Sequence, residues 1–290
     1  MRRLRISAIS YLNTAPLMWD FEHGHLAQHF DISYTVPSLC AQALAEDKAD
    51  IGIIPAIAYQ TIPDLAIIPE IAIAAGGPVR SILLVSKVPV DQINSVAVDT
   101  SSRTSVALLE ILFRKAWLAP RASLPKFSPQ APNLETMLGT NDAALLIGDP
   151  ALTVDRAKYH TVDLAEAWHR ATGKPFVFAF WAVRRAAIAE HADPAQFTAI
   201  FQHSRDHGLA HLDEIAREWA PRVGISEADV CDYLSRNIDF SFGEANQAGL
   251  QLFFRLAHEF GLIPQIRALE FLSAGLGATP AAKAKSLLAL

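Results

Sequence analysis

The chain has 290 residues, of which 51% are hydrophobic and 19% are charged, and its net charge at pH 7 is −5. This length and composition fit a compact soluble protein with two ordinary domains or one large one. The acidic balance and the scattered basic residues argue against nucleic acid or an anionic membrane as a partner. The two cysteines, Cys40 and Cys231, have neither the spacing of metal ligands nor that of a disulfide framework.

The N-terminus begins with Met1-Arg2-Arg3, as signal peptides often do, but Arg5 interrupts the apolar run that follows. That run is short, and no small-residue cleavage site comes after it. No stretch reaches the roughly 18 uninterrupted apolar residues of a membrane span. We therefore expect a cytoplasmic protein with no membrane-spanning segment.

The first part of the chain alternates between apolar strands and helices. Short apolar or alternating runs predict strands at residues 4–9, 31–36 and 51–55, with helices between them. Such a β-α-β-α-β order forms a parallel sheet with right-handed crossovers. Apolar runs at residues 66–74 and 81–86 predict two more strands, joined by a turn that contains Gly-Gly-Pro.

A second unit of the same character follows, and then a helical region. Residues 95–99 predict a strand, residues 100–105 a hydroxyl-rich loop and residues 106–116 a helix. Further strands are predicted at 143–147, 161–164 and 175–183. From Arg185 onward, a 3.6-residue periodicity predicts helices at 197–212, 212–219, 227–237 and 244–260, followed by a frayed tail at 274–290.

This order predicts an α/β protein with two lobes, a hinge and a helical C-terminal third. Lobe 1 would comprise residues 1–85 plus 184–290, and lobe 2 residues 86–183. The chain would cross between the lobes near residues 85–90 and 178–183, and a ligand would lie in the cleft between them. That is the architecture of the type 2 periplasmic-binding-protein fold.

Ser10, Tyr11, Asn13 and Thr14 follow the first strand, at the sheet edge where α/β proteins bind ligands. We interpret these side chains as one side of the predicted cleft. The alternative is an ordinary strand-to-helix turn in which Thr14 is the N-cap. Pro16 suits the first turn of a helix in either case.

Residues 100–105 contain five hydroxyl side chains in six positions, more than helix capping by Ser101 or Ser102 requires. Free N–H groups and the helix dipole at a helix N-terminus attract anions. We therefore predict a carboxylate-binding site that includes Ser102, Thr104 and Ser105, with simple N-capping as the alternative.

Gly148 and Asp149 lie at the end of another predicted strand. Glycine lets a ligand approach the backbone there, and Asp149 is a candidate acid or base. The alternative role of Asp149 is to cap the next turn. Arg80 follows the Gly-Gly-Pro turn and is either a carboxylate ligand or an exposed surface arginine.

Two groups of histidines have spacings that also occur in metal sites. His203, His207 and His211 are four residues apart, and three more histidines lie between residues 23 and 29. Metal-binding helices use such spacing with a carboxylate nearby. Because Gly208 interrupts the first group and neither group follows a strand of the cleft, we expect solvated histidines and no metal. The sequence has no glycine-rich nucleotide loop and no nucleophile motif for acyl transfer.

Several segments resemble the chorismate dehydratase family, which acts in the futalosine route to menaquinone. They are residues 10–17 (Ser-Tyr-Leu-Asn-Thr-Ala-Pro-Leu), 77–86, 102–109, 144–149 and 172–181, together with Trp168. The resemblance runs in order from residue 4 to about residue 260. One departure is Lys174, where an apolar residue is expected after Thr-Gly, and it leaves the lining of this loop open.

The resemblance implies an enzyme that converts chorismate into 3-[(1-carboxyvinyl)oxy]benzoate and water without a metal or organic cofactor. Its partner would be this small dicarboxylate, and the sequence predicts no particular oligomeric state. We expect Thr104 and Ser105 to bind one carboxylate, and Asn13 to hold the enolpyruvyl or hydroxyl end. Ser81 and Arg80 would line the hinge side of the cleft.

The catalytic residues are expected to be Asn13 and a base, which is either Asp149 or the substrate's own side-chain carboxylate. Two other functions would use the same cleft. One is the 1,4-dihydroxy-6-naphthoate-forming synthase that acts later in the same pathway, although the Ser-Tyr-Leu-Asn-Thr start argues against it. The other is a non-catalytic protein that binds aromatic carboxylates.

Overall fold

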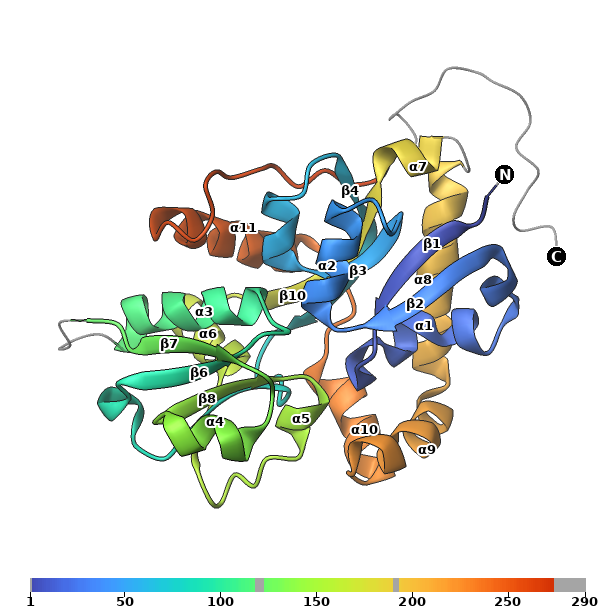
Figure 1. The fold of residues 1–290 in the computed structure, drawn as a ribbon. Helices are drawn as coiled ribbons and strands as arrows, with labels where there is room; N and C mark the ends of the chain where they lie inside the picture. Colours follow the sequence, from blue (N-terminus) through green and yellow to red (C-terminus); the bar gives the residue numbers. More distant parts are fainter. Residues whose placement is uncertain (1, 118–122, 190–192, 274–290) are drawn as a thin grey trace.

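Two five-stranded sheets organise the computed structural model, which describes residues 2–117, 123–189 and 193–273. Sheet A has the order β2 (Phe30–Thr35), β1 (Leu4–Ile9), β3 (Ile51–Pro55), β10 (Phe176–Arg184) and β4 (Leu65–Ala75). Sheet B has the order β7 (Lys126–Gln130), β6 (Ser95–Asp99), β8 (Ala143–Ile147), β5 (Ile82–Ser86) and β9 (His160–Asp163). Figure 1 shows the two sheets, each with its own helices, as two lobes side by side.

The first three strands form the expected parallel arrangement, with β1 between β2 and β3. Every residue of β3 is buried, as its uninterrupted apolar sequence predicts for a strand covered on both faces. β10 runs antiparallel to both β3 and β4, and it lies between them. Its return from the second lobe completes the core of sheet A.

The chain changes sheets at places that differ from those expected from the sequence. β5 is hydrogen-bonded to β8 and β9, so its residues belong to sheet B, although the expected boundary at residue 85 assigns most of them to lobe 1. β10 belongs to sheet A, although the expected boundary at residue 184 assigns it to lobe 2. We therefore propose that the lobes divide within residues 76–81 and 164–175.

Helices cover both sheets, and short 3₁₀ or π turns, labelled η, connect them. The helices are α1 (Ala15–Glu22), α2 (Pro37–Ala45), α3 (Thr104–Leu112), α4 (Leu134–Thr140), α5 (Asp149–Leu152), α6 (Leu164–Thr172), α7 (Arg185–Ala189), α8 (Pro194–Ala210), α9 (Leu212–Val223), α10 (Glu227–Asp232) and α11 (Glu244–Glu259). The turns are η1 (Leu12–Thr14), η2 (His25–His29), η3 (Ala56–Gln60), η4 (Val90–Gln92), η5 (Phe113–Trp117) and η6 (Tyr233–Asn237).

The C-terminal helices are distributed over both lobes. α8 packs closely along α1, because a β-carbon added at Gly208 would lie 2.2 Å from the carbonyl oxygen of Pro16. α9 contacts α1 in the first lobe and α5 in the second, and α11 packs on β10 and α3. Figure 1 shows α9 and α10 below the junction of the two lobes. The segment after β10 therefore contacts both lobes.

Some elements lacked a prediction from the sequence, namely β7, α4, α5 and α6. β7 contains Pro129 and is an edge strand with partly exposed residues, which weakens the usual apolar signal. α6 begins at the N-cap Asp163 and ends at Gly173 in the left-handed region, so its boundary signals are present. The expected tail at residues 274–290 lies outside the described residues. No helix in the described part of the chain is long and apolar enough to cross a membrane.

Candidate active site in the cleft between the lobes

A small cavity of about 40 Å³ lies between the two lobes. Its polar lining comes from Tyr11 and Asn13 after β1 and from Ser102, Thr104 and Ser105 at the start of α3. Gly148, after β8, lines it too, and the other lining residues are apolar. The structure thus brings together six of the predicted site residues, from three separate segments of the chain.

Asn13 lies in η1, is half-buried and lines this cavity. Its Oδ1 atom is buried and has no hydrogen-bond partner in the described part of the chain. A buried acceptor without a donor costs roughly 1–3 kcal/mol of stability. Such a group is suited to accept a hydrogen bond from a ligand that carries a hydroxyl.

Tyr233 contacts Asn13 and Ser81, although no sequence pattern singled it out, and neither Tyr233 nor Ser81 lines the cavity. Its side chain is fully buried in η6, and its hydroxyl donates a 2.8 Å hydrogen bond to Ser81 Oγ. Burial raises the pKa of the Tyr233 phenol, and contacts with Ser81 and Asn13 oppose that rise. Asn13, Ser81 and Tyr233 therefore form one buried polar group, which we call the amide cluster.

Asp149 is held by the opposite lobe. Its Oδ1 atom accepts a 2.9 Å hydrogen bond from the backbone N–H of Leu12. Burial raises the pKa of the Asp149 carboxyl to about 6, and the Leu12 hydrogen bond acts in the other direction. Asp149 is the first residue of α5 and does not line the cavity in this closed arrangement.

Gly148 allows this close approach of the two lobes. Its φ of 65° and ψ of −146° lie in a region that only glycine adopts readily. A β-carbon at this position would lie 2.7 Å from the ring of Tyr11. The absence of a side chain at Gly148 therefore lets the Tyr11 ring pack against the end of β8, next to Asp149.

Another carboxylate, that of the buried residue Asp99, is connected to Tyr11 through Ser101. Asp99 Oδ1 accepts hydrogen bonds from the Ser101 N–H at 2.8 Å and the Ser101 hydroxyl at 2.6 Å. The Ser101 hydroxyl is 3.4 Å from the Tyr11 hydroxyl. Burial raises the pKa of Asp99, against the effect of the Ser101 hydrogen bonds. The sequence placed Asp99 only at a strand end, so the connection to the cleft was missed.

Direct hydrogen bonds between the lobes hold the cleft closed. Besides the Leu12–Asp149 bond, Ile57 N–H donates to Thr104 Oγ1 at 3.2 Å. Ser38 N–H donates to the Ser101 carbonyl at 3.0 Å. Ile57 and Ser38 lie in the first turns of η3 and α2, so their N–H groups are helix-terminal donors that suit an anion.

The hydroxyl-rich loop combines the two roles that the sequence left open. Ser102 Oγ accepts a hydrogen bond from Ser105 N–H at 3.2 Å, which is the expected N-capping contact. Ser102, Thr104 and Ser105 also line the cavity. Capping therefore occupies one hydroxyl and leaves others facing the cleft.

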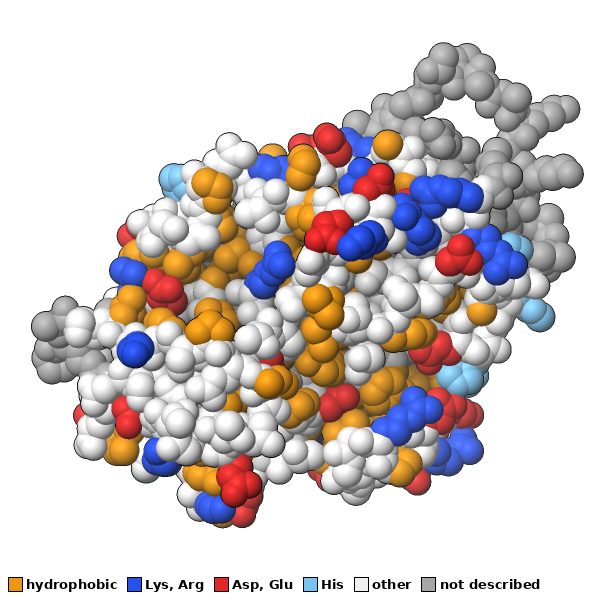
Figure 2. Space-filling model, in the orientation of Figure 1, with side chains coloured by type: hydrophobic (Ala, Val, Ile, Leu, Met, Phe, Trp, Pro, Cys, Tyr) orange, Lys and Arg blue, Asp and Glu red, His pale blue; other side chains and the backbone are white. Residues whose placement is uncertain are grey.

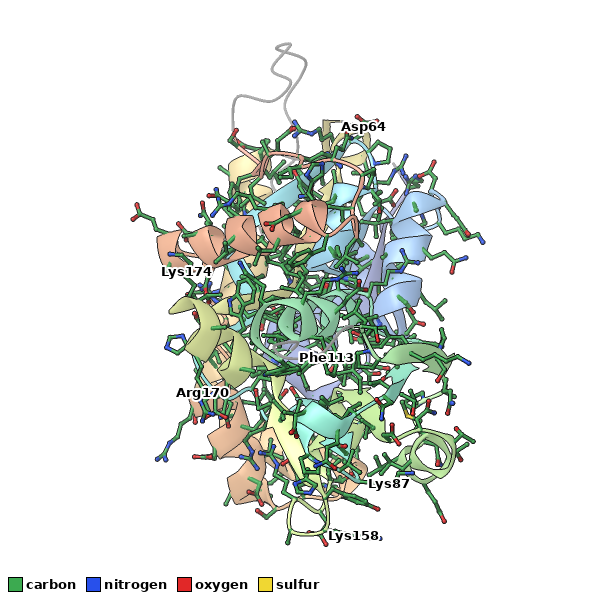
Figure 3. All side chains as sticks on the ribbon, turned by 90° about the vertical axis from the view of Figure 1, so that its left-hand side faces the viewer. Asp64, Lys87, Phe113, Lys158, Arg170 and Lys174 are labelled. Carbon is green, nitrogen blue, oxygen red and sulfur yellow. The ribbon has the colours of Figure 1, made fainter. Side chains whose placement is uncertain are left out.

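Three predicted residues point elsewhere. The Arg80 guanidinium lies 3.4 Å from carboxylate oxygens of Asp229 and of Asp232, outside the cavity. The Thr14 hydroxyl donates to backbone carbonyls of its own turn, at 2.6 and 2.7 Å, and Ser10 is exposed. Both of these residues line a different cavity. Lys174 is at the edge of the molecule beside α11, as Figure 3 shows, and does not line the cleft cavity.

That different cavity measures about 350 Å³ and lies on the far side of the turn after β1. Ile9, Ala15 and Met18 form its apolar wall, and Trp219 and Arg222 of α9 close it. Figure 2 shows hydrophobic side chains gathered in a hollow in this region, with basic and acidic side chains around it. The turn that carries Asn13 therefore separates two hollows.

The chain matches known proteins over nearly all of its length. A model of the menaquinone biosynthesis family matches residues 4–259. The chorismate dehydratase of Thermus thermophilus is 29% identical over 271 residues, which cover 87% of this chain and 94% of that protein.

Solved structures match the fold at lower identity. Protein AF1704 from Archaeoglobus fulgidus has a TM-score of 0.71 at 17% identity and covers 90% of this chain and 98% of its own. The periplasmic aliphatic sulphonate binding protein SsuA from Escherichia coli has a TM-score of 0.61 at 16% identity and covers 99% of both chains. The fold is thus that of the periplasmic binding proteins, as the sequence predicts.

Proposed function

The chain belongs to the menaquinone biosynthesis family, and we propose that it is a chorismate dehydratase, a hydro-lyase that forms 3-[(1-carboxyvinyl)oxy]benzoate and water. The observation that carries this proposal is the combination of the family match with a cleft that has an unpaired buried amide oxygen on one side and hydroxyls at a helix N-terminus on the other. Chorismate has a hydroxyl and two carboxylates, which complement these two kinds of group.

The elimination requires loss of the proton on ring carbon C3 and of the hydroxyl on C4. The electron pair of the broken C3–H bond spreads through the ring double bond to the ring carboxylate. Donors placed at that carboxylate stabilise the developing charge. We assign this task to the hydroxyls of Thr104 and Ser105 together with backbone N–H groups at the start of α3.

The amide cluster would act on the other end of the substrate. Asn13 Oδ1 is an unpaired buried acceptor, so it can hold the C4 hydroxyl through that hydroxyl's proton. Ser81 Oγ accepts a hydrogen bond from the Tyr233 hydroxyl, so its own O–H remains available to donate to the substrate once the lobes have parted. When the C4–O bond breaks, the departing hydroxide takes the proton that the base removed from C3 and leaves as water, and the ring becomes aromatic.

Asp149 is the base that we propose from the protein. A carboxyl with a pKa of about 6 is largely ionised at pH 7 and is a stronger base than an ordinary aspartate. The alternative base is the substrate's own side-chain carboxylate, in which case that group, and not Asp149, would pass the proton to the departing hydroxide. Asn13 cannot take a proton, so it positions the substrate in either case.

Substrate entry requires that the lobes separate. The cleft cavity of about 40 Å³ is far smaller than the roughly 300–1,000 Å³ of typical ligand sites. Opening would break the bonds that Leu12 and Ile57 make across the cleft, which frees their N–H groups for the substrate. We therefore propose that closure around chorismate replaces lobe-to-lobe hydrogen bonds with lobe-to-substrate ones.

The decisive experiment incubates the purified protein with chorismate, follows the loss of the diene absorbance and identifies the product by mass spectrometry. We expect the benzoate product in proportion to enzyme, and much less with Asn13→Ala. Binding of chorismate without turnover would instead indicate a binding protein. Turnover of a later pathway intermediate alone would indicate the naphthoate-forming synthase.

We further propose that the protein serves the futalosine route and works in the cytoplasm. The segments that resemble the dehydratase family support the first proposal. Restored menaquinone formation in a futalosine-route host that lacks its own chorismate dehydratase would test it. Fractionation of cells that express the chain would test the second.

A further inference from the structure

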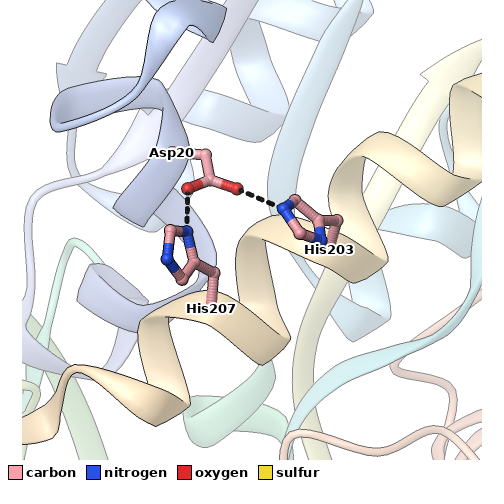
Figure 4. Close-up of side chains that lie close together, drawn as sticks. All are labelled: Asp20, His203 and His207. Atoms are coloured by element: carbon pink, nitrogen blue, oxygen red, sulfur yellow. Dashed lines mark hydrogen bonds and ion pairs between the residues drawn. The ribbon is translucent and has the colours of Figure 1, made fainter. Parts of the chain in front are cut away.

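The structure brings a buried carboxylate to the histidine pair on α8. Asp20 of α1 lies between His203 and His207, as Figure 4 shows. The ligand atoms of the three side chains all lie within 4.8 Å of one another. We call these three residues the α1–α8 triad. The sequence predicted solvated histidines because Gly208 interrupts the group and it follows no strand of the cleft, but helix packing places the Asp20 carboxylate between two of them.

Two hydrogen bonds of Ser204 fix the position of the Asp20 backbone. Ser204, which lies between the two histidines in sequence, accepts from the Asp20 N–H at 3.1 Å and donates to the Leu17 carbonyl at 3.1 Å. These bonds and the close crossing at Gly208 set the register of α1 against α8. The triad is therefore built on two packed helices and not on a loop.

The Asp20 carboxylate needs a cationic partner. Its side chain is only 10% exposed, and the two imidazoles are the only groups that contact its oxygens in the described part of the chain. A buried carboxylate is costly unless a cation or several donors face it. The histidines are 76% and 43% exposed, so ions from solvent can reach them.

The distances in the triad suit a divalent cation. His207 Nδ1 is 2.6 Å from one carboxylate oxygen, and His203 Nε2 is 3.7 Å from the other. Neighbouring ligand atoms of a tetrahedral zinc ion are about 3.3 Å apart, so binding would lengthen the first separation, shorten the second and turn one carboxylate oxygen toward the ion. Two nitrogens and one oxygen also form a set that zinc and similar d-block ions prefer.

We propose that Asp20, His203 and His207 bind one divalent d-block cation of the zinc type, with the remaining coordination positions filled by water. The ion would join α1 to α8 at a site apart from the cleft cavity. His211 does not belong to it, because its Nδ1 contacts the His207 carbonyl and its ring stacks on Trp19.

The test is a calorimetric titration of the full chain, stripped of metal with a chelator, with ZnCl₂ at pH 7.5. We expect one equivalent to bind to the wild type. His203→Ala removes an exposed ligand without disturbing the core, and it should weaken binding at least tenfold. His258→Ala, which removes an exposed histidine from α11, is the matched control and should leave the affinity unchanged.

Two further measurements sharpen the result. Asp20→Asn keeps the shape of the side chain and should also weaken binding tenfold, provided that its circular dichroism matches the wild type. A titration with CoCl₂ should produce visible absorption bands of a low-coordinate cobalt ion in the wild type and not in His203→Ala. Equal zinc isotherms for the wild type and His203→Ala, or no saturable first equivalent, would overturn the proposal.

Discussion

Replacing Asp149 with asparagine should make the protein more stable and less active. The folded-state pKa of about 6 lies above the ordinary value of 3.8, so ionisation of Asp149 opposes folding. That difference corresponds to about 3 kcal/mol, and partial exposure reduces it, so we expect a gain of about 2 kcal/mol for Asp149→Asn. Asparagine can still accept the hydrogen bond from Leu12 N–H.

The gain should depend on pH in a defined direction. The favourable contribution of Asp149 is complete below its unfolded pKa, near 3.8, and is lost as pH rises through about 6. The asparagine variant should therefore match the wild type near pH 4 and exceed it above pH 7. Urea unfolding, followed by circular dichroism at several pH values, measures this difference directly.

Asp142 provides a control of opposite sign. Backbone N–H groups of Asn94 and Ser95 donate to its carboxylate, and they lower the pKa of Asp142. Asp142→Asn should therefore destabilise the protein at pH 7, with less effect in acid. A stability difference for Asp149→Asn that stays constant between pH 4 and pH 8 would refute the reasoning, as would full dehydratase activity in that variant.

Three other changes test the cleft. Asn13→Ala should reduce turnover about 100-fold without lowering the unfolding free energy by more than about 1 kcal/mol, because the amide oxygen that it removes has no partner in the described structure. Equal turnover would exclude Asn13 from the mechanism. Tyr233→Phe should lower the unfolding free energy by about 1 kcal/mol in urea and lower turnover about tenfold, because Ser81 loses its hydrogen-bond donor. Unchanged kinetics would show that the Tyr233–Ser81 hydrogen bond is only structural. Gly148→Ala should lower the unfolding free energy in urea by at least about 2 kcal/mol. The new β-carbon would clash with the Tyr11 ring, and the backbone of residue 148 has a conformation that only glycine adopts readily. Wild-type stability of this variant would contradict that conformation.

The strands of the core were predictable because local composition determines them. The runs at residues 51–55 and 143–147 are apolar at nearly every position, and the run at 95–99 has an apolar centre between Ser95 and Asp99. All three are strands with those limits. Local composition does not determine which of the two sheets a strand belongs to. β5 pairs with β8, which lies about sixty residues further along the chain, and no local pattern encodes that pairing.

The same distinction applies to the cleft. Asn13, Thr104 and Gly148 follow strands or begin helices, so the general rule for α/β sheets pointed to them. Tyr233 contacts Ser81 from a C-terminal segment whose sequence predicts only an apolar helix face, so nothing in the sequence marks it as a site residue. Arg80 was expected in the cleft, but two carboxylates of the C-terminal segment bind it. Long-range packing decides both cases.

The hydrogen bonds that join the two lobes across the cleft have a kinetic consequence. Ile57 and Leu12 are paired with Thr104 and Asp149 in the closed arrangement, so chorismate can enter only when the lobes have parted. The apparent affinity is then the intrinsic affinity reduced by the open fraction. In a stopped-flow experiment, the observed binding rate should level off at high chorismate concentration, and the plateau would equal the rate at which the lobes open.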